Sequence, residues 1–402
     1  MSQAFETVKK NDISHVMQSY GRYPVALHSG HNAHVTDVDG KEYVDLLAGI
    51  AVCGLGHCND ELCAELEKQA HTIWHTSNLF YQEPQPELAR RLEETAHFGK
   101  AFFCNSGAEA NEALIKLARR YMTRVLGKED AYEIITLSGC FHGRTLGTLA
   151  ATGRAGLMDG FTPVAGGFKQ VPAGDLDALK EAMSAKTCAV LLEVVQGEGG
   201  VIPLPAEYVQ AVEALCREKG VLFCCDEVQA GMCRTGRFWA FQTCNVKPDI
   251  ISVAKSLANG LPMGAILATD EVARAFVPGS HATTFGGSPL VAAVASKTVE
   301  IMVRDNLAAR AEKLGNALMD RAKAFMAANP GKIKEVRGKG LFIGIELTGP
   351  AKSVWEELLK RGFICNLCHE VTLRLLPPLT IGEEDLSAFM DALEDILASY
   401  KA

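Results

Sequence analysis

The sequence feature that most limits the fold is a regular alternation of apolar runs and helix-like segments between residues 100 and 269. The apolar runs lie at 101–104, 133–137, 189–195, 221–228, 250–254 and 265–269. Segments 108–126 and 206–219 show the spacing of amphipathic helices, and Gly220 follows the second segment where a helix would end. Because strands that are apolar throughout must be buried on both faces, the alternation predicts a mostly parallel sheet with helices on either side. The predicted fold class is therefore α/β.

The pattern changes after residue 289. A long Ala-rich helix is predicted first, followed by a strand that ends near Leu347, a helix at 354–360, a strand through Arg374 and a closing helix to Tyr400. This mixture predicts a smaller α+β domain of residues 290–402.

The N-terminal part of the chain contains a candidate hairpin at residues 35–44, whose turn would be formed by Asp39 and Gly40. We expect the hairpin, and with it an N-terminal segment of residues 1–48, to pack with the small domain. The large domain is then predicted to span residues 49–289.

Charge and hydropathy limit the partners of the chain. Its 402 residues include 40 Lys and Arg against 48 Asp and Glu, which gives a formal net charge of −8. Because this field repels polyanions, nucleic acid is not an expected partner. The sequence has no apolar run of about 18 residues that would span a membrane, and residues 1–20 lack the apolar core of a signal peptide. We therefore expect a cytoplasmic protein that does not bind membranes.

Thirteen cysteines are present, and several lie within apolar stretches where reduced, buried thiols are expected. Cys365 and Cys368 form a CxxC motif without a second pair at zinc-site spacing. His71 and His75 have the spacing of a helical metal site but lack the glutamate that such motifs carry. No metal is expected.

Two charged residues lie where apolar runs end. Asp226 lies near the end of one run, and Lys255 follows the next run, 29 residues further on (255 − 226). Ligands of α/β folds bind at the carboxyl edge of the sheet. A desolvated lysine can form a Schiff base, and an aspartate can keep a pyridine nitrogen protonated, so the two residues suit pyridoxal 5'-phosphate (PLP). Taken alone, they fit a buried ion pair equally well.

A candidate anion site is formed by Ser106, Gly107 and Ala108, which follow a strand and open a helix. Free backbone N–H groups and the positive end of the helix dipole favour a phosphate there. The simpler alternative is a serine that only caps the helix. Phe141 and Val228 each follow a separate strand, and they either flank a flat ring or belong to the core.

In their order along the chain, these motifs resemble those of the class III (ornithine-type) aminotransferases, which have PLP fold type I. The resemblance covers nearly the whole chain. Its motifs are residues 43–50, 103–112, 141–144, 193–198, 226–229, Lys255, 284–287 and Arg374. The implied fold is a large domain with a mostly parallel central sheet and a smaller α+β domain.

The resemblance implies roles for the residues of a PLP site. Lys255 resembles the lysine that holds the cofactor as a Schiff base and transfers the proton, and Asp226 resembles the partner of the pyridine nitrogen. The other implied contacts are Gln229 near the ring hydroxyl, Gly107 and Ala108 at the phosphate with Ser106 beside them, and Phe141 and Val228 stacked on the ring. Thr284 resembles a phosphate ligand that the neighbouring subunit donates, so the resemblance implies a homodimer with shared active sites.

The same resemblance implies how substrates bind. Arg144 resembles the arginine that binds the carboxylate far from the reacting amine, with help from Tyr20, and Thr283 resembles a hydroxyl near the substrate. Glu198 and Arg374 resemble a pair that stays closed for an ω-amine and opens so that Arg374 can bind the α-carboxylate of glutamate. The alternative for Arg144, Glu198 and Arg374 is surface ion pairing.

The expected reaction is transamination between a small amino donor and 2-oxoglutarate. The stretch 74–81, together with the Glu198–Arg374 pair, resembles that of enzymes whose donor is N2-acetyl-L-ornithine. This resemblance implies N-acetyl-L-glutamate 5-semialdehyde and L-glutamate as products, a step of arginine biosynthesis. Ornithine, succinylornithine, succinyldiaminopimelate and 4-aminobutyrate enzymes share nearly all these motifs and stay open as alternatives. An aminomutase, a decarboxylating relative and a non-catalytic binding protein of the same fold are the remaining ones.

Overall fold

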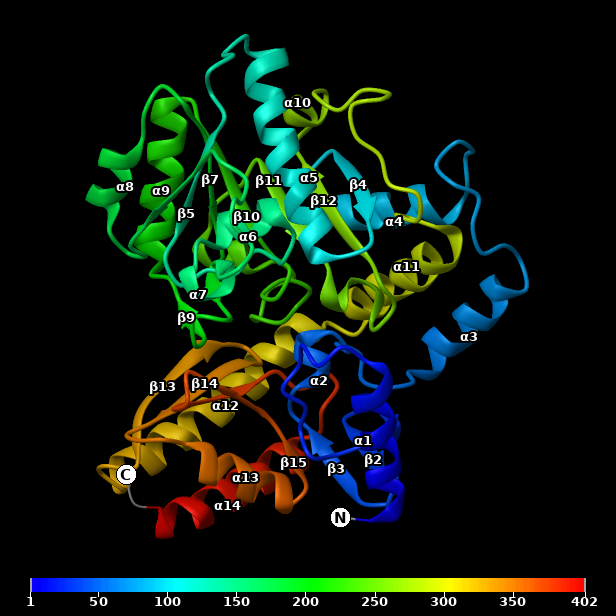
Figure 1. Ribbon diagram of the computed structural model, residues 1–402, viewed down its shortest axis with the longest axis vertical. Helices are drawn as coiled ribbons and strands as arrows, with labels where there is room; N and C mark the ends of the chain where they lie inside the picture. The colour runs from blue at the N-terminus through cyan, green and yellow to red at the C-terminus, as the bar shows by residue number, and fades with distance from the viewer. Residues whose placement is uncertain (1, 401–402) are drawn as a thin grey trace.

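A seven-stranded sheet forms the centre of the upper lobe of the molecule in Figure 1, in a computed structural model that describes residues 2–400. The strand order is β4-β12-β11-β10-β7-β5-β6. The strands span Lys100–Cys104 (β4), Gly264–Ala268 (β12), Ile250–Val253 (β11), Leu222–Asp226 (β10), Thr187–Leu192 (β7), Glu133–Leu137 (β5) and Phe168–Val171 (β6). Only β12 runs antiparallel to its neighbours, so the prediction of a mostly parallel central sheet is confirmed.

Alternate residues of each strand pack against different helices, which explains the continuous apolar runs. In β10, Phe223 and Cys225 belong to the core cluster that includes Val212 of helix α9 (Ala206–Lys219). Their neighbours Leu222 and Cys224 belong to a second cluster with helix α5 (Gly107–Arg120). Because successive side chains of a strand point to opposite faces, both faces need apolar residues. The sheet is therefore covered on both sides.

Several predicted boundaries were correct and others were not. The predicted helix at 206–219 coincides with α9, and Gly220 ends it in the left-handed conformation, with a φ of 60°. The runs at 189–195 and 221–228 are longer than β7 and β10, because buried residues such as Val194 and Glu227 lie in loops beyond the strands. Strand β6 was not predicted, and its sequence Phe-Lys-Gln-Val is only partly apolar, as suits the edge of a sheet.

The lower lobe contains most of the chain after residue 305 together with the N-terminal segment (Figure 1). One sheet has the order β13-β14-β17-β16, and a second has the order β1-β2-β3-β15. Their strands are Ile333–Lys339 (β13), Phe342–Leu347 (β14), Thr372–Leu375 (β17), Asn366–Cys368 (β16), Leu27–His31 (β1), His34–Asp37 (β2), Glu42–Asp45 (β3) and Phe363–Ile364 (β15). Strand β3 pairs with β15, so one sheet contains strands from the N-terminal and the C-terminal part of the chain. The domain limits at residues 48 and 289 stay a prediction.

The remaining elements surround these sheets. The helices are α1 (Gln3–His15), α2 (Ala48–Ala51), α3 (Asp60–Ala70), α4 (Pro84–Glu93), α6 (Leu146–Thr152), α7 (Ala155–Met158), α8 (Leu176–Ala182), α10 (Asp270–Ala273), α11 (Pro289–Arg304), α12 (Leu307–Ala328), α13 (Lys352–Lys360) and α14 (Glu383–Ser399). Strands β8 (Val195–Gln196) and β9 (Ile202–Pro203) form a short ladder. Short turns of π- or 3₁₀-helix lie at Tyr121–Val125, Ala240–Cys244 and Lys255–Ala258. The predicted single Ala-rich helix was wrong: α11 and α12 are separated by Asn306, whose φ of 49° ends helical geometry.

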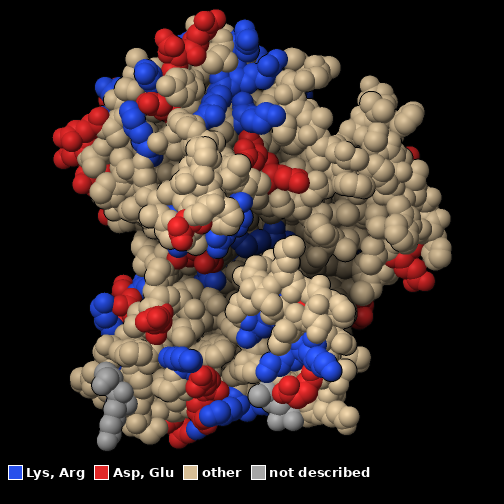
Figure 2. Space-filling model, in the orientation of Figure 1, with Lys and Arg blue, Asp and Glu red and all other residues tan. Residues whose placement is uncertain are grey.

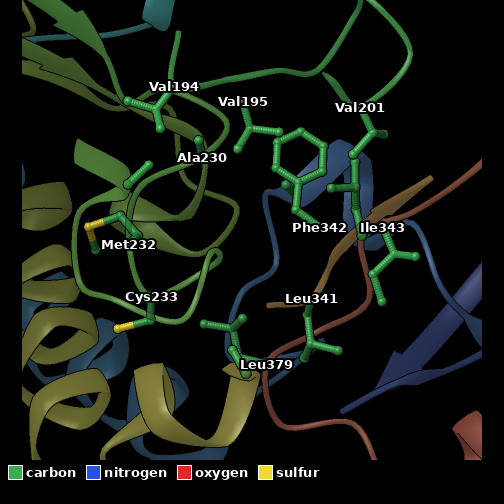
Figure 3. Packing of buried hydrophobic residues seen from close by; sticks show 14 of the residues in the cluster. Val194, Val195, Val201, Ala230, Met232, Cys233, Leu341, Phe342, Ile343 and Leu379 are labelled. Atoms are coloured by element: carbon green, nitrogen blue, oxygen red, sulfur yellow. The ribbon is translucent and has the colours of Figure 1, made fainter. Parts of the chain in front are cut away.

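One apolar core joins the two lobes. Figure 3 shows Val195 and Val201 of the upper lobe close to Phe342 and Ile343 of the lower lobe, and all four residues are buried. Figure 2 shows a hollow between the lobes with basic side chains inside it. The shared core therefore fixes the lobes on either side of a recess. None of the helices within residues 2–400 is long and apolar enough to cross a membrane.

Candidate active site

A cavity of about 380 Å³ lies at the carboxyl edge of the central sheet. Its walls come from the loops that follow β4, β5, β10 and β11 and from the first turn of α5. Nine of the residues predicted from the sequence line it, namely Ser106, Gly107, Ala108, Phe141, Arg144, Asp226, Val228, Gln229 and Lys255. These residues are distant in the sequence, and the ends of the parallel strands bring them to one place.

Asp226 is the last residue of β10, and its carboxylate is held from three directions. Its Oδ1 accepts a hydrogen bond from the amide of Val228 at 2.9 Å. Its Oδ2 accepts one from Asn111 Nδ2 at 2.7 Å and lies 2.8 Å from His142 Nδ1. Asn111 also donates to the backbone carbonyl of His142, which ties the two partners together. The orientation of the carboxylate is therefore fixed by buried neighbours.

The same contacts keep Asp226 charged inside the protein. Burial tends to raise the pKa of Asp226, but the hydrogen bond and the charge of His142 outweigh it and hold the pKa below the ordinary value of 3.8. Burial opposes a charge on His142, yet Cys140 and Asp226 raise the pKa of that imidazole well above 6.5. The Asp226 carboxylate is therefore favoured in its ionised form, and it can bind a further proton donor in the cavity.

Lys255 lies two residues after β11 and faces the same cavity. Its φ of 44° is unusual for a residue with a side chain, and it indicates local backbone strain at this position. Burial lowers the pKa of Lys255 below its ordinary value of 10.5, although the charges of Asp226 and Glu193 oppose this shift. A lowered pKa increases the share of neutral amine, which is the nucleophilic form.

The first turn of α5 forms the anion-binding end of the cavity. Ser106 caps the helix, because its Oγ accepts a hydrogen bond from Glu109 N at 3.1 Å. Among residues 2–400, the amide N–H groups of Gly107 and Ala108 have no hydrogen-bond partner. A Cβ at position 107 would lie only 2.8 Å from Val228 Cγ1, so only glycine fits this close approach. Free N–H groups at a helix start suit a phosphate.

A second charged site lies between the lobes. Arg374 of β17 is buried, and its Nη1 donates to Glu198 Oε1 at 2.5 Å and to Gln229 Oε1 at 3.2 Å. Burial raises the pKa of Glu198, but the charge of Arg374 outweighs it and keeps the pKa below the ordinary value. Gln229 also lines the cavity, so it connects this ion pair to the cavity. The pair is partly buried and is not a surface contact.

Three further predicted residues do not line the cavity within one chain, namely Tyr20, Thr283 and Thr284. Thr284 and Tyr20 are exposed, and neither lines the cavity. Thr283 is half-buried, and its Oγ1 accepts a hydrogen bond from Asn105 Nδ2 at 3.2 Å, which places it next to the rim. Arg144 lines the cavity but its side chain is exposed and lies over the ring of Phe141. The roles inferred for all four residues stay predictions.

Sequence reasoning assigned no role to three residues of the site, Asn111, His142 and Glu193, although each lies in a motif that carries the resemblance. Asn111 lies on the apolar face of α5, where a polar residue in a buried stripe is the signal that would have identified it. Glu193 is 4% exposed and accepts a hydrogen bond from Phe141 N at 3.0 Å. Burial, aided by the charge of Asp226, raises the pKa of Glu193 to about 7. Within residues 2–400 no cluster of three His, Cys, Asp or Glu side chains has the arrangement of a metal site.

Comparison with known proteins agrees with this geometry. Residues 16–397 match the family Aminotransferase class-III. The chain is 44% identical to the acetylornithine aminotransferase of Methanocaldococcus jannaschii over 96% of each chain. A structure of the ornithine aminotransferase from Toxoplasma gondii, with PLP at partial occupancy in its active site, has a TM-score of 0.94, 32% identity and coverage of 98% of this chain and 94% of that one. The acetylornithine aminotransferase from Elizabethkingia anophelis has a TM-score of 0.88, 32% identity and coverage of 99% and 100%.

The chain therefore belongs to the class-III aminotransferases, which are PLP-dependent enzymes. The cavity fits this cofactor on its own evidence. It offers unpaired amides for a phosphate at one end, a charged carboxylate deep in the site, and an amine of lowered pKa. A flat ring could lie between Phe141 and Val228, which line the walls.

Proposed function

We propose that this enzyme transfers the ω-amino group of N2-acetyl-L-ornithine to 2-oxoglutarate, giving N-acetyl-L-glutamate 5-semialdehyde and L-glutamate. The observation that carries the proposal is the Glu198–Arg374 ion pair beside the cavity. An enzyme that takes an ω-amine and then glutamate must fit two substrates, only one of which has a carboxylate next to the reacting amine. A buried arginine with a displaceable carboxylate partner meets both needs.

The relatives support this choice of donor. The acetylornithine aminotransferase of Methanocaldococcus jannaschii matches the chain nearly end to end at 44% identity. Ornithine aminotransferase, represented by the Toxoplasma gondii structure, is the second candidate because its fold matches closely. Both donors have an amine at the end of a chain, so the Glu198–Arg374 pair serves either one.

We assign the residues of the cavity as follows. Lys255 would hold PLP covalently and would later carry the proton that leaves the amine-bearing carbon of the substrate to the cofactor. Asp226 accepts a hydrogen bond from the protonated ring nitrogen, while Asn111 and His142 keep the carboxylate in place. When bound, PLP supplies an electron sink for the charge that develops as a C–H bond breaks.

The remaining assignments concern binding of the phosphate and the substrates. The amides of Gly107 and Ala108, next to Ser106, bind the phosphate, and Gln229 lies near the ring hydroxyl. Arg144, assisted by Tyr20, binds the carboxylate of the substrate that lies far from the reacting amine. Thr283 provides a hydroxyl near the substrate.

A donor panel tests the proposal directly. The purified enzyme is given N-acetylornithine, ornithine, N-succinylornithine, succinyldiaminopimelate or 4-aminobutyrate, each with 2-oxoglutarate, and kcat/KM is measured for each. We expect the highest value with N-acetylornithine and no turnover of any donor by Lys255→Ala. A higher value for another donor would replace N-acetylornithine as the proposed substrate. Absence of turnover with the whole panel would contradict the proposed reaction.

We also propose that the enzyme is a homodimer whose sites are shared. The loop between α3 and α4 exposes several large apolar side chains: Ile73 at 44%, Trp74 at 63%, Leu79 at 87%, Phe80 at 69% and Tyr81 at 108%. Figure 2 shows few charged side chains on the right of the molecule, where Figure 1 places α3, α4 and α11. Large exposed apolar patches are typical of interfaces between subunits. Thr284 is exposed and would reach the phosphate of the partner's cofactor.

Mixed dimers test the shared site. A Lys255→Ala chain and a Thr284→Ala chain are each expected to be poorly active as homodimers. If Thr284 acts across the interface, co-expression gives a mixed dimer in which one site has both residues intact, and activity returns. If Thr284 acts within its own chain, each site keeps one defect and no activity returns.

For the cellular location, the thirteen free thiols suit a reducing compartment, and we place the enzyme in the cytoplasm.

A further inference from the structure

Asn366 lies directly opposite Arg374 on neighbouring strands. Strands β16 and β17 pair in antiparallel register with Asn366 aligned to Arg374, so both side chains are on the same face of the sheet. The Oδ1 atom of Asn366 accepts a hydrogen bond from Nε of Arg374 at 3.0 Å. The contact holds the side of the guanidinium that faces away from Glu198.

The amide of Asn366 is fixed in one orientation by its other contacts. Its Nδ2 donates to the hydroxyl of Tyr23 at 3.0 Å, and the thiol of Cys368 donates to Oδ1 at 3.1 Å. Tyr23 packs edge-on against Trp355, with ring centroids 4.7 Å apart. A flipped amide would turn its NH₂ group toward the Nε–H of Arg374 and place two donors against each other. The acceptor therefore stays on the side of Arg374.

This contact limits how Arg374 can bind a carboxylate. A guanidinium can bind a carboxylate with two hydrogen bonds, either through Nε and one Nη or through both Nη atoms. Asn366 occupies Nε, and Nη1 donates to both Glu198 and Gln229. Among residues 2–400 we find no hydrogen bond from Nη2. An incoming carboxylate must therefore use the edge formed by both Nη atoms, where it competes with Glu198 for Nη1.

We propose that Asn366 is a positioning residue that forces Glu198 and the α-carboxylate of glutamate to compete for one edge of Arg374. In this way Asn366 contributes to the enzyme's discrimination between its two substrates. The proposal rests on the proposed role of the Glu198–Arg374 pair and deepens it. Without Asn366, the buried arginine would be free to turn its Nε edge toward Glu198 and form a tighter, two-bond pair.

The first test replaces the amide by an apolar group of similar size, Asn366→Leu. Glutarate, a five-carbon dicarboxylate that has no amine or keto group, serves as the binding probe for the PLP-loaded enzyme. By calorimetry we expect its Kd to rise roughly tenfold, because loss of the acceptor costs Arg374 its orientation. In single-turnover measurements the glutamate half-reaction should slow by a similar factor, and the N-acetylornithine half-reaction should change less than about threefold.

A second variant, Asn366→Asp, keeps the shape of the side chain and adds a negative charge beside Nε. This charge would neutralise Arg374 even when Glu198 is absent. The double variant Glu198→Ala/Asn366→Asp should therefore regain much of the discrimination against glutamate that Glu198→Ala alone loses. A residue with only a structural role would not restore substrate discrimination. Because this variant is isosteric, it also carries the test if Asn366→Leu fails to fold.

A matched control variant distinguishes a positioning role of Asn366 toward Arg374 from a role in packing alone. Tyr23→Phe removes the acceptor for Nδ2 but leaves the contact between Oδ1 and Arg374, so glutarate affinity should change less than about threefold. Equal slowing of both half-reactions in Asn366→Leu, unchanged glutarate affinity, or no recovery in the double variant would each overturn the proposal. Failure of the proposed function is a separate result, because the donor panel reveals it with the unmodified enzyme while glutarate binding needs no donor.

Discussion

The cofactor end and the substrate end of the cavity hold their charges in different ways. Asp226 is 4% exposed, and both oxygens of its carboxylate contact hydrogen-bond partners inside the protein. Arg374 is equally buried, but the side chain of its partner Glu198 is 34% exposed. A carboxylate that reaches solvent can leave its partner at a much lower desolvation cost than an enclosed one. The difference indicates a rigid end for the cofactor and an adjustable end for two substrates.

The largest effect is expected from the rigid end, at Lys255. Lys255→Ala should reduce transamination by about 10⁴-fold or more, because both the covalent link and the proton transfer are lost. Borohydride reduction followed by mass spectrometry should find the cofactor on the Lys255 peptide of the unmodified enzyme. Lys255→Arg, which keeps the charge, is the matched control and should be similarly inactive. A label on a different lysine would refute the assignment.

The next largest effect is expected at Asp226. Asp226→Asn keeps the shape of the side chain but cannot keep a ring nitrogen protonated, so kcat and kcat/KM should fall together by about 10²- to 10³-fold. The variant should still bind PLP, which its visible absorbance can measure. If Asp226 were only half of a structural ion pair with His142, the variant would lose stability and keep near-normal turnover. Thermal melting and turnover, measured on the same preparation, distinguish these results.

At the adjustable end, substitutions of Glu198 and Arg374 should have smaller effects, and they should shift the preference between the two substrates in opposite directions. Glu198→Ala should favour glutamate over the ω-amine by about 5- to 150-fold in the ratio of kcat/KM, which corresponds to roughly 1–3 kcal/mol. The reason is that Arg374 no longer has to release a partner before it binds glutamate. Arg374→Ala should damage the glutamate half-reaction far more than the N-acetylornithine one. Equal losses in both half-reactions would make the pair structural and remove the contrast between the two ends.

The sequence predicted the rigid end better than the adjustable end, for a physical reason. The strand ends of a parallel sheet meet at one edge, so Asp226, Lys255 and Gly107 could be placed together from the apolar runs alone. Their partners could not be placed in this way. The contact between Asn111 and Asp226 joins residues 115 positions apart, and it depends on the direction of one side chain from α5.

Contacts that depend on strand register also could not be predicted from the sequence. Asn366 and Arg374 were both visible in the C-terminal segment, but only the register of β16 and β17 places them opposite each other. The Ala-rich segment after residue 289 gave a continuous helical pattern, and the break at Asn306 comes from one left-handed residue. Thr284 and Tyr20 lie outside the cavity of a single chain, and the role expected for Thr284 requires a partner subunit.

The smallest predicted effect concerns Glu193 and the cost of enclosing charge at the rigid end. Burial, with the charge of Asp226, raises the pKa of Glu193 to about 7 from its ordinary value of 4.5. A carboxyl with a raised folded-state pKa holds its proton more tightly in the folded protein than in the unfolded chain. Its contribution to stability is therefore complete below about pH 4.5 and is lost as the pH rises through about 7.

Glu193→Gln cannot ionise, and its side-chain oxygen can still accept the hydrogen bond from Phe141 N. In cofactor-free protein, the variant should therefore gain stability over the unmodified chain as the pH rises from about 5 to about 8, by up to about 3 kcal/mol. Urea unfolding at several pH values measures the difference. Glu181→Gln, at an exposed position, is the control and should give a difference that does not change with pH. If the stability difference between Glu193→Gln and the unmodified chain does not change with pH, burial does not disfavour the charged form of Glu193. The rigid end would then enclose its charges without a cost in stability.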